Sequence, residues 1–217
     1  HCNTTEGQMG KVILFAQQKG GSGKTTLLTQ IACQLIGQNK STTLIDVDPQ
    51  RTVTSWFDTR LQKRGEAGME LIESSEWRVS GDVRRARGGS DYVLIDAPGN
   101  ADILGRFAMR EANFAVVPCQ PSMPDVWASE ATLAMLTKSA CDHAVVLNRC
   151  PPRSKAADEA AEALSETGAE IFAERIGQRA AFTDAFLKGA GVTETQKSSK
   201  AAEEIVALTE ALVKEVG

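Results

Sequence analysis

The sequence predicts an α/β fold in which a doubly wound, mainly parallel β-sheet is flanked by helices. Short runs of apolar and β-branched residues alternate with longer segments of helical periodicity, which is the order of βαβ units. Several short runs are apolar on consecutive residues, as strands buried on both faces of a parallel sheet are. A glycine-rich segment lies between the first such run and the first helical segment, and this is the context of a phosphate-binding loop.

The elements follow from these patterns in chain order. The clearest apolar runs predict strands at residues 11–16, 42–46, 92–96, 114–118 and 144–148, and weaker runs predict strands at 69–72 and 169–173. Helical periodicity predicts helices at residues 24–37, 53–64, 81–86, 101–111, 126–139, 156–167, 179–188 and 201–216. Parallel strands joined by right-handed crossovers place such helices on both faces of the sheet.

Length and composition favour one globular domain. The chain has 217 residues, of which 42% are hydrophobic and 24% charged, and it shows no low-complexity linker. We expect residues 1–10 to be a disordered lead or a non-native remnant, with the start at Met9, and residues 11–217 to form a single domain.

Composition also excludes several classes of protein. No apolar run is long enough for a membrane span, and no secretory signal is present. The five cysteines are scattered, which favours buried thiols in a reducing compartment, so we expect a cytoplasmic protein. The net charge of −4 excludes a protein coated in positive charge, although it leaves room for a local basic patch.

The most informative segment is Gln-Gln-Lys-Gly-Gly-Ser-Gly-Lys-Thr-Thr at residues 17–26. Its glycines let the backbone curl and point N–H groups at phosphate oxygens, and the following helix adds the positive end of its dipole. Lys24 is placed to reach the β- and γ-phosphates, and Thr25 to ligate Mg²⁺. The expected nucleotide-binding residues are Gly20, Gly21, Ser22, Gly23, Lys24, Thr25 and Thr26.

Acidic residues end two of the predicted strands. Asp46 ends the strand at 42–46 and Asp48 lies two residues further on, so both point to one side at the carboxyl edge of the sheet. Asp96 ends the apolar strand at 92–96, as the Mg²⁺-associated carboxylate of a phosphate-binding site does, and we expect it beside Thr25. Residues 97–100 then stand in the place of a loop that senses the γ-phosphate.

The phosphate loop departs from the standard G-x-x-x-x-G-K-[ST] pattern, because Gln18 stands where glycine is required and Lys19 follows it. This K-G-G-S-G-K-T variant resembles the deviant Walker A motif of the ParA/MinD family of ATPases, which are P-loop NTPases. The resemblance implies that ATP binding forms a face-to-face sandwich homodimer in which Lys19 crosses to the nucleotide of the second copy. It also implies that Asp48 positions and polarises the attacking water, and that Asp46 is an outer-sphere or structural partner.

Two further segments resemble the family, which extends the likeness from about residue 11 to residue 183. Residues 117–128 resemble a segment of small ParA proteins that lies near the dimer face. Residues 146–149 follow the strand where the family places its base contacts, which makes Asn148 the adenine candidate.

Among the family's branches the residues favour the small ParA-type partition ATPases, which bind DNA non-specifically as ATP dimers. No helix-turn-helix segment precedes the phosphate loop in this sequence. The resemblance then implies slow Mg²⁺-dependent hydrolysis stimulated by a ParB-like or cargo-adaptor protein, partition or positioning of a plasmid, chromosome or protein cargo, and association with the nucleoid. The candidate DNA contacts are Arg149, Arg153, Lys155, Arg175, Arg179, Lys188, Lys197 and Lys200, together with Arg84, Arg85 and Arg87.

Two alternatives stay open. A MinD-like membrane-associated positioning ATPase would end in an amphipathic helix with a basic face, but the polar positions of 201–216 carry four glutamates against Lys214, so no membrane contact is expected. A nucleotide-binding scaffold that does not hydrolyse ATP is the other alternative.

Overall fold

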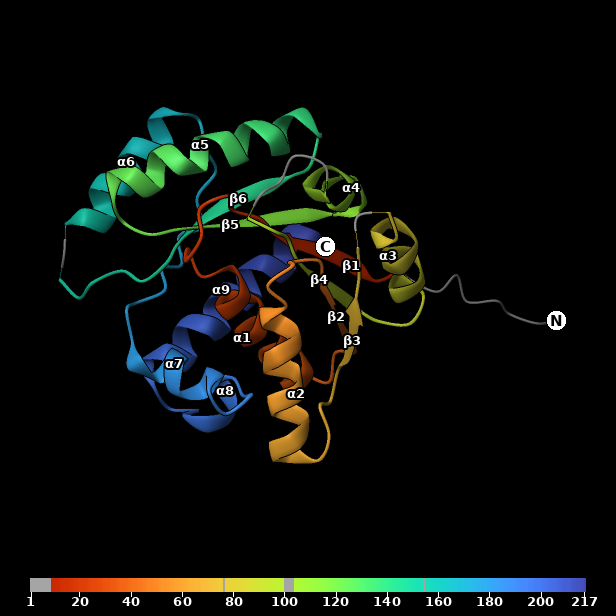
Figure 1. Cartoon of the computed structure of the whole chain (residues 1–217). Coiled ribbons are helices and arrows are strands. Elements are labelled where there is room, and N and C mark those ends of the chain that lie inside the picture. The colour runs from red at the N-terminus through yellow and green to blue at the C-terminus, as the bar shows by residue number, and fades with distance from the viewer. Residues whose placement is uncertain (1–8, 76, 100–103, 154) are drawn as a thin grey trace.

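The carboxyl ends of six parallel strands meet at one edge of a single sheet, and this edge positions the site (Figure 1). The computed structural model describes residues 9–75, 77–99, 104–153 and 155–217. Within them the strand order is β3-β2-β4-β1-β5-β6, and every neighbouring pair is parallel. The strands are β1 (Lys11–Phe15), β2 (Thr42–Asp46), β3 (Glu70–Glu73), β4 (Tyr92–Asp96), β5 (Phe114–Cys119) and β6 (His143–Leu147).

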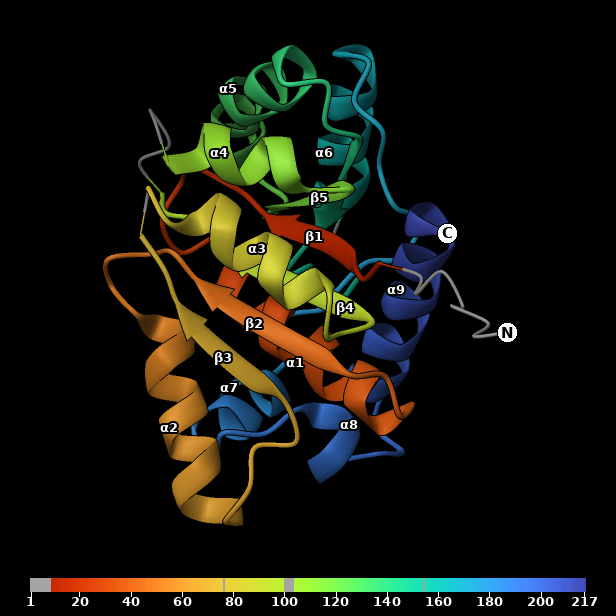
Figure 2. The ribbon, with the colours of Figure 1, turned by 90° about the vertical axis from the view of Figure 1, so that its right-hand side faces the viewer.

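Helices cover both faces of the sheet, as Figure 2 shows from the side. One face is covered by α1 (Lys24–Gly37), α2 (Thr52–Arg64), α7 (Ala180–Phe186), α8 (Val192–Thr195) and α9 (Lys200–Val216). The other face is covered by α3 (Val79–Arg87), α4 (Leu104–Glu111), α5 (Met123–Lys138) and α6 (Ala156–Glu166).

The consecutive apolar residues of the strands divide between two hydrophobic cores. In β1, Ile13 and Phe15 pack under α1 and α9, whereas Val12 and Leu14 pack on the opposite face. All four side chains are fully buried. Alternate residues of a strand point to opposite faces, so an unbroken apolar run is what a sheet covered on both sides requires.

Most of the predicted elements are confirmed, and one is wrong. The segment 169–173 forms only an isolated bridge from Ile171 to Val145 on β6. Its backbone exchanges hydrogen bonds with Val145 of β6 through Glu170 and Phe172 but does not continue into a ladder, and the Phe172 ring packs into the core beside Phe114. The short helix α8 was not predicted, and α5 begins earlier than expected because the Ser122 side chain caps it.

Parts of three predictions lie outside the described residues, namely 1–8 of the expected lead, 100 of the expected sensing loop and 101–103 of the expected helix at 101–111. Gly10, the last residue of that lead, is buried, and its N–H donates to the Arg87 carbonyl oxygen at 2.9 Å.

Candidate nucleotide site

The glycine-rich segment forms a tight loop from the end of β1 to the start of α1. Gly21 and Gly23 have φ angles of +77° and +102°, a region that side chains with a Cβ rarely adopt. A Cβ on Gly23 would also lie 2.2 Å from Asn148 Nδ2. Position 23 therefore requires glycine for two reasons, its backbone conformation and the lack of space for a Cβ.

Lys24 begins α1 and is buried at the base of the loop. The residue is only 8% exposed, and Nζ donates to the Gln17 carbonyl oxygen at 3.0 Å. The ammonium group is thus held among the backbone groups that line the loop.

Thr25 and Asp96 are brought together as expected. The Thr25 hydroxyl donates to Asp96 Oδ2 at 2.6 Å, while the buried Oδ1 has no hydrogen-bond partner among the described residues. Burial raises the Asp96 pKa to about 7, and the charges of Asp46 and Asp48 add to this effect against the Thr25 hydrogen bond and Lys24. A buried carboxylate with a free oxygen beside a threonine hydroxyl fits the oxygen donors that Mg²⁺ prefers.

No cluster of three or more His, Cys, Asp or Glu side chains among the described residues could hold a metal by itself. A hydroxyl and one carboxylate suit Mg²⁺ that takes its remaining ligands from phosphates and water.

The two acids at the carboxyl end of β2 have different partners. Asp46 is buried and accepts hydrogen bonds from the Thr54 N–H and hydroxyl at 2.9 and 2.8 Å, and from the Asp48 N–H at 3.1 Å. Asp46 therefore fixes the turn into α2. Asp48 lies beside the loop and accepts from the Gln50 N–H at 2.9 Å.

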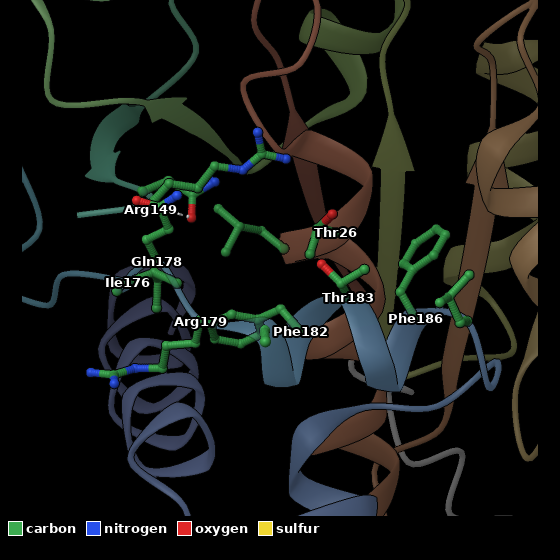
Figure 3. A pocket seen from close by; sticks show the side chains of 13 residues that line it. Thr26, Arg149, Ile176, Gln178, Arg179, Phe182, Thr183 and Phe186 are labelled. Carbon is green, nitrogen blue, oxygen red and sulfur yellow. Dashed lines mark hydrogen bonds between the residues drawn. The ribbon is translucent and has the colours of Figure 1, made fainter. Parts of the chain in front are cut away.

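Two adjoining cavities surround the loop. The first, about 720 Å³, is lined by residues 20–26, Asp48 and its neighbours, and Gly99. The second, about 530 Å³, lies between the loop after β6 and α7 (Figure 3). Thr26 and Arg149 line both cavities. The glycine-rich loop beside a second pocket that is lined in part by Phe182 and Phe186 offers room for the two ends of a nucleotide.

Asn148 is buried beside the loop. Its Nδ2 donates to the Ser22 carbonyl oxygen at 2.8 Å, and its Oδ1 accepts from the Arg149 N–H at 2.9 Å. Its carboxamide thus has protein partners that the sequence did not reveal, whereas the predicted adenine contact stays a prediction.

Lys19 contacts α5 of its own chain. Its Nζ lies 2.6 Å from Asp125 Oδ2, and the two side chains are 38% and 7% exposed. Gln17 anchors the same stretch of the loop, because its carboxamide bonds to the Ser129 and Thr132 hydroxyls at 2.9 and 3.1 Å. The sequence analysis missed this α5 contact, although Asp125, Ser129 and Thr132 recur at helical spacing.

Several basic residues that were candidates for DNA contact form ion pairs. The pairs are Arg84–Glu111, Arg85–Asp82, Arg175–Asp158, Arg179–Glu204 and Lys200–Glu203. Arg87 donates to the Gly10 carbonyl oxygen. Within the part of the chain that the structure describes, the exposed side chains of Arg153, Lys155, Lys188 and Lys197 have no such partner.

The apolar stripe of α9 is buried. Ile205, Leu208, Leu212 and Val216 all belong to the core beneath the sheet. None of the helices in the described residues is long and apolar enough to cross a membrane.

Comparison with known proteins decides the family. A family model described as the CobQ/CobB/MinD/ParA nucleotide binding domain matches residues 13–192, which is most of the chain. The chain belongs to this family. The ParA/MinD resemblance and the P-loop NTPase fold are therefore confirmed.

Curated relatives of this ParA/MinD-family chain cover nearly its full length. The maintenance of carboxysome distribution protein A of Halothiobacillus neapolitanus is 29% identical over 200 residues, covering 89% of this chain and 92% of the relative. Protein ParA of Rhizobium radiobacter is 26% identical over 198 residues, or 87% of each chain.

Solved structures share the fold at low identity. The ATP complex of a Cyanothece McdA variant aligns with a TM-score of 0.79 and 17% identity over 95% of this chain and 98% of that one. Aquifex aeolicus MinD aligns with a TM-score of 0.80 and 19% identity over 94% and 98%. Cobyrinic acid a,c-diamide synthase from Mycobacterium smegmatis, with bound ADP and magnesium, aligns with a TM-score of 0.77 and 18% identity over 95% of each chain. ATP and Mg²⁺ as ligands, and the ATPase class, are thereby confirmed at the level of the family.

Proposed function

We propose that this chain is a Mg²⁺-dependent ATPase that partitions or positions a cargo by switching between ATP-bound and ATP-free states. One observation carries the proposal: Lys24, Thr25, Asp48 and Asp96 converge at the phosphate loop. The names of the relatives, a carboxysome distribution protein and a ParA protein, support a role in positioning or partition.

In this proposal the nucleotide spans both cavities. The loop N–H groups and Lys24 bind the phosphates, and the base enters the pocket beside α7. When bound, Mg²⁺ supplies charge neutralisation at the phosphates. Asp96 accepts the Thr25 hydrogen bond and keeps its second oxygen free toward the ion and its water shell.

Hydrolysis depends on Asp48 and Lys19. Asp48 lines the loop cavity, where its carboxylate orients a water for in-line attack on the γ-phosphate. Lys19 reaches the nucleotide of a second copy in an ATP homodimer, and it must leave Asp125 to do so. Hydrolysis then separates the copies, and a ParB-like or cargo-adaptor partner accelerates the cycle.

Non-specific DNA is the proposed track, which would associate the protein with the nucleoid. The unpaired side chains of Arg153, Lys155, Lys188 and Lys197 are free to neutralise phosphates, and a dimer doubles their number. The membrane alternative loses its main support, because the apolar stripe of α9 is buried and the exposed face of the helix carries three glutamates against two lysines, not the basic face that anionic lipid requires.

The test is binding to random-sequence duplex DNA with ATP, with ADP and without nucleotide, at two salt concentrations. Asp48→Ala blocks hydrolysis, so we expect ATP-dependent, salt-sensitive binding that persists in this variant. Phosphate release by wild type but not by Asp48→Ala separates an ATPase from a scaffold that only holds nucleotide.

A matched pair of lysines controls for charge. Lys197→Ala removes an unpaired cation and should weaken DNA binding, whereas Lys200→Ala removes a cation paired with Glu203 and should matter less. Absence of DNA binding under every nucleotide condition would contradict the DNA track, and liposome pelleting would then test the membrane alternative.

A further inference from the structure

We propose that the outer face of α3, with the turn before it, is a docking surface for an acidic peptide segment of a partner protein. The surface consists of Trp77, Arg78, Gly81, Arg84 and Arg85, which we call the α3 patch. None of these five residues lines the two cavities around the phosphate loop, so the inference goes beyond the proposed function and does not depend on it. It also assigns Arg84 and Arg85 to a protein partner instead of DNA.

The α3 patch is one face of an amphipathic helix. Its residues recur at helical spacing and are exposed, whereas Val79, Val83 and Ala86 are buried in the core on the sheet side. Figure 2 shows α3 in front of β1 and β4, against which it packs, and no helix is drawn over it. The described part of the chain therefore leaves this face open to a partner.

Trp77 is the apolar anchor of the α3 patch. It is 81% exposed, more than any other large hydrophobic side chain among the described residues. The Arg78 guanidinium carbon lies 5.6 Å from the centroid of its ring, which places a cation beside the aromatic face. Tryptophan and arginine are enriched among the residues that dominate the binding energy of protein interfaces, so this pair is suited to contact a partner.

The exposed charge of the α3 patch is positive. The side chains of Arg78, Arg84 and Arg85 are 47%, 71% and 71% exposed. Their carboxylate partners, Asp82 and Glu111, are only 12% and 13% exposed, so the acids lie beneath the guanidinium groups.

These ion pairs leave most of the guanidinium donors free. A guanidinium has five N–H donors, and Arg84 and Arg85 each use one of them in a hydrogen bond to a described residue. The remaining donors suit a second carboxylate, which arginine binds with two parallel hydrogen bonds. A basic surface on a chain of net charge −4 favours an acidic partner by charge complementarity.

Gly81 lies in the middle of the α3 patch. A Cβ at this position would meet no atom within 4 Å, and the φ angle is not positive, so neither space nor backbone conformation requires glycine. Glycine inside a helix costs stability relative to alanine. Close approach of a partner's backbone to α3 would account for a glycine that the fold itself does not need.

An acidic peptide fits the α3 patch better than duplex DNA does. Non-specific DNA binding depends on cations that neutralise phosphates, and it would leave the Trp77 ring without a contact. A peptide that carries both acidic and apolar side chains contacts the ring and the arginines together.

The experiment measures peptide binding by fluorescence anisotropy without nucleotide. The probes are two fluorescein-labelled peptides of equal length, one made of Glu and Leu residues and one in which every Glu is replaced by Lys. Wild type should bind the acidic peptide more tightly than the basic one, and the affinity should fall as the salt concentration rises. The double variant Arg84→Gln and Arg85→Gln should weaken acidic-peptide binding about tenfold, and so should Trp77→Ala.

Arg175→Gln is the matched control for the loss of charge. Arg175 is an exposed arginine that is paired with Asp158 outside the α3 patch, so the variant should bind the acidic peptide as wild type does. Gly81→Ala should raise the melting temperature, because alanine favours the helix, and should lower the affinity for the acidic peptide. Unchanged ATP affinity in the patch variants shows that they are folded.

Three outcomes would overturn the inference. They are failure of wild type to prefer the acidic peptide, unchanged affinity for it in the double variant and in Trp77→Ala, and loss of random-sequence duplex DNA binding in the double variant with peptide binding intact. The last outcome would assign the α3 patch to DNA. A wild-type chain that binds the acidic peptide but no ATP would contradict the proposed function and leave this inference standing.

Discussion

Two acids, the half-buried Glu194 in α8 and the fully buried Asp96 at the end of β4, have opposite electrostatic surroundings. Burial alone would raise the Glu194 pKa, yet hydrogen bonds from Arg60 and from the Gly191 N–H, with the charges of Arg60 and Arg64, lower it to about 2. Burial raises the Asp96 pKa to about 7, and one of its oxygens has no partner among the described residues.

The pKa values of Glu194 and Asp96 shift in opposite directions because Glu194 is ion-paired with arginines and Asp96 is not. Arg60 is 2% exposed and gives two parallel hydrogen bonds of 2.8 Å to Glu194, while its remaining donors reach the carbonyl oxygens of Ala67 and Gly189. These hydrogen bonds of Arg60 join α2 to α8 and stabilise the fold without a ligand. A buried carboxylate with one unpartnered oxygen, as Asp96 has among the described residues, is costly in the fold, and such a group is typical of a ligand-binding site.

The largest expected effect separates binding from folding. Lys24→Ala should weaken ATP binding about a thousandfold, or ~4 kcal/mol, because it removes the cation that faces the phosphates. The nucleotide-free protein should melt within a few degrees of wild type, since the Lys24 side chain donates only to Gln17 among the described residues. Calorimetry and thermal melting measure the two quantities, and a large loss of stability without a loss of affinity would contradict the assignment.

The second largest expected effect is a loss of folding stability. Glu194→Gln should lower the free energy of unfolding by ~3 kcal/mol at pH 7, because it leaves Arg60 buried without its counter-charge. The depressed Glu194 pKa means that the stabilisation is complete above about pH 4.5 and is lost as the pH falls toward about 2. Urea unfolding at pH 7 and pH 3 should therefore show a difference that shrinks with acid.

Glu210→Gln, at an exposed position of α9, is the control for Glu194→Gln and should leave stability unchanged. A change of more than threefold in the ATP affinity of Glu194→Gln would break the division between the two clusters.

Asp96→Asn should raise the free energy of unfolding of the nucleotide-free protein, whereas Glu194→Gln lowers it. The folded state binds the Asp96 proton more tightly than the unfolded state does, so wild type loses stability as the pH rises from about 4 through about 7. The amide carries no charge to desolvate, so the nucleotide-free variant should be more stable than wild type by about 1–2 kcal/mol at pH 8. Stabilisation by ATP with Mg²⁺ should be lost, and equal stability of the two proteins at pH 8 would refute the cost assigned to Asp96.

The smallest expected effect concerns the Lys19–Asp125 ion pair, which joins the phosphate loop to α5. Asp125→Asn should lower the free energy of unfolding by about 1 kcal/mol or less, because Lys19 is partly exposed. Sedimentation with and without ATP then assigns the pair. If Asp125→Asn dimerises with ATP at a lower protein concentration than wild type, the ion pair restrains Lys19 from binding the nucleotide of the second copy. If the protein concentration needed for dimerisation is unchanged, the pair contributes only to folding.

The sequence predicted the fold well because its signals are local. Consecutive apolar residues mark buried parallel strands, and the glycines with Lys24 and Thr25 mark the loop, whatever the distant contacts are. The strand expected at 169–173 failed because pairing along an edge depends on the partner strand, and local propensity does not report it.

The site was predicted only as far as motifs reach. The contacts of Asp125 with Lys19, of Gln17 with Ser129 and of Asn148 with Ser22 were missed because each joins residues more than a hundred positions apart. The ion pairs of Arg175 with Asp158 and of Arg179 with Glu204 are equally invisible in the sequence.

Both margins of the sheet discourage pairing with strands of other chains. Along β6, the backbone of Glu170, Phe172 and Ile176 occupies the outer hydrogen-bonding groups of Val145 and Leu147. On the far margin, β3 is only four residues long and exposes a glutamate at each end. Short, charged or covered edge strands resist intermolecular β-augmentation. Many copies of the chain can therefore crowd together without joining through the edges of their sheets.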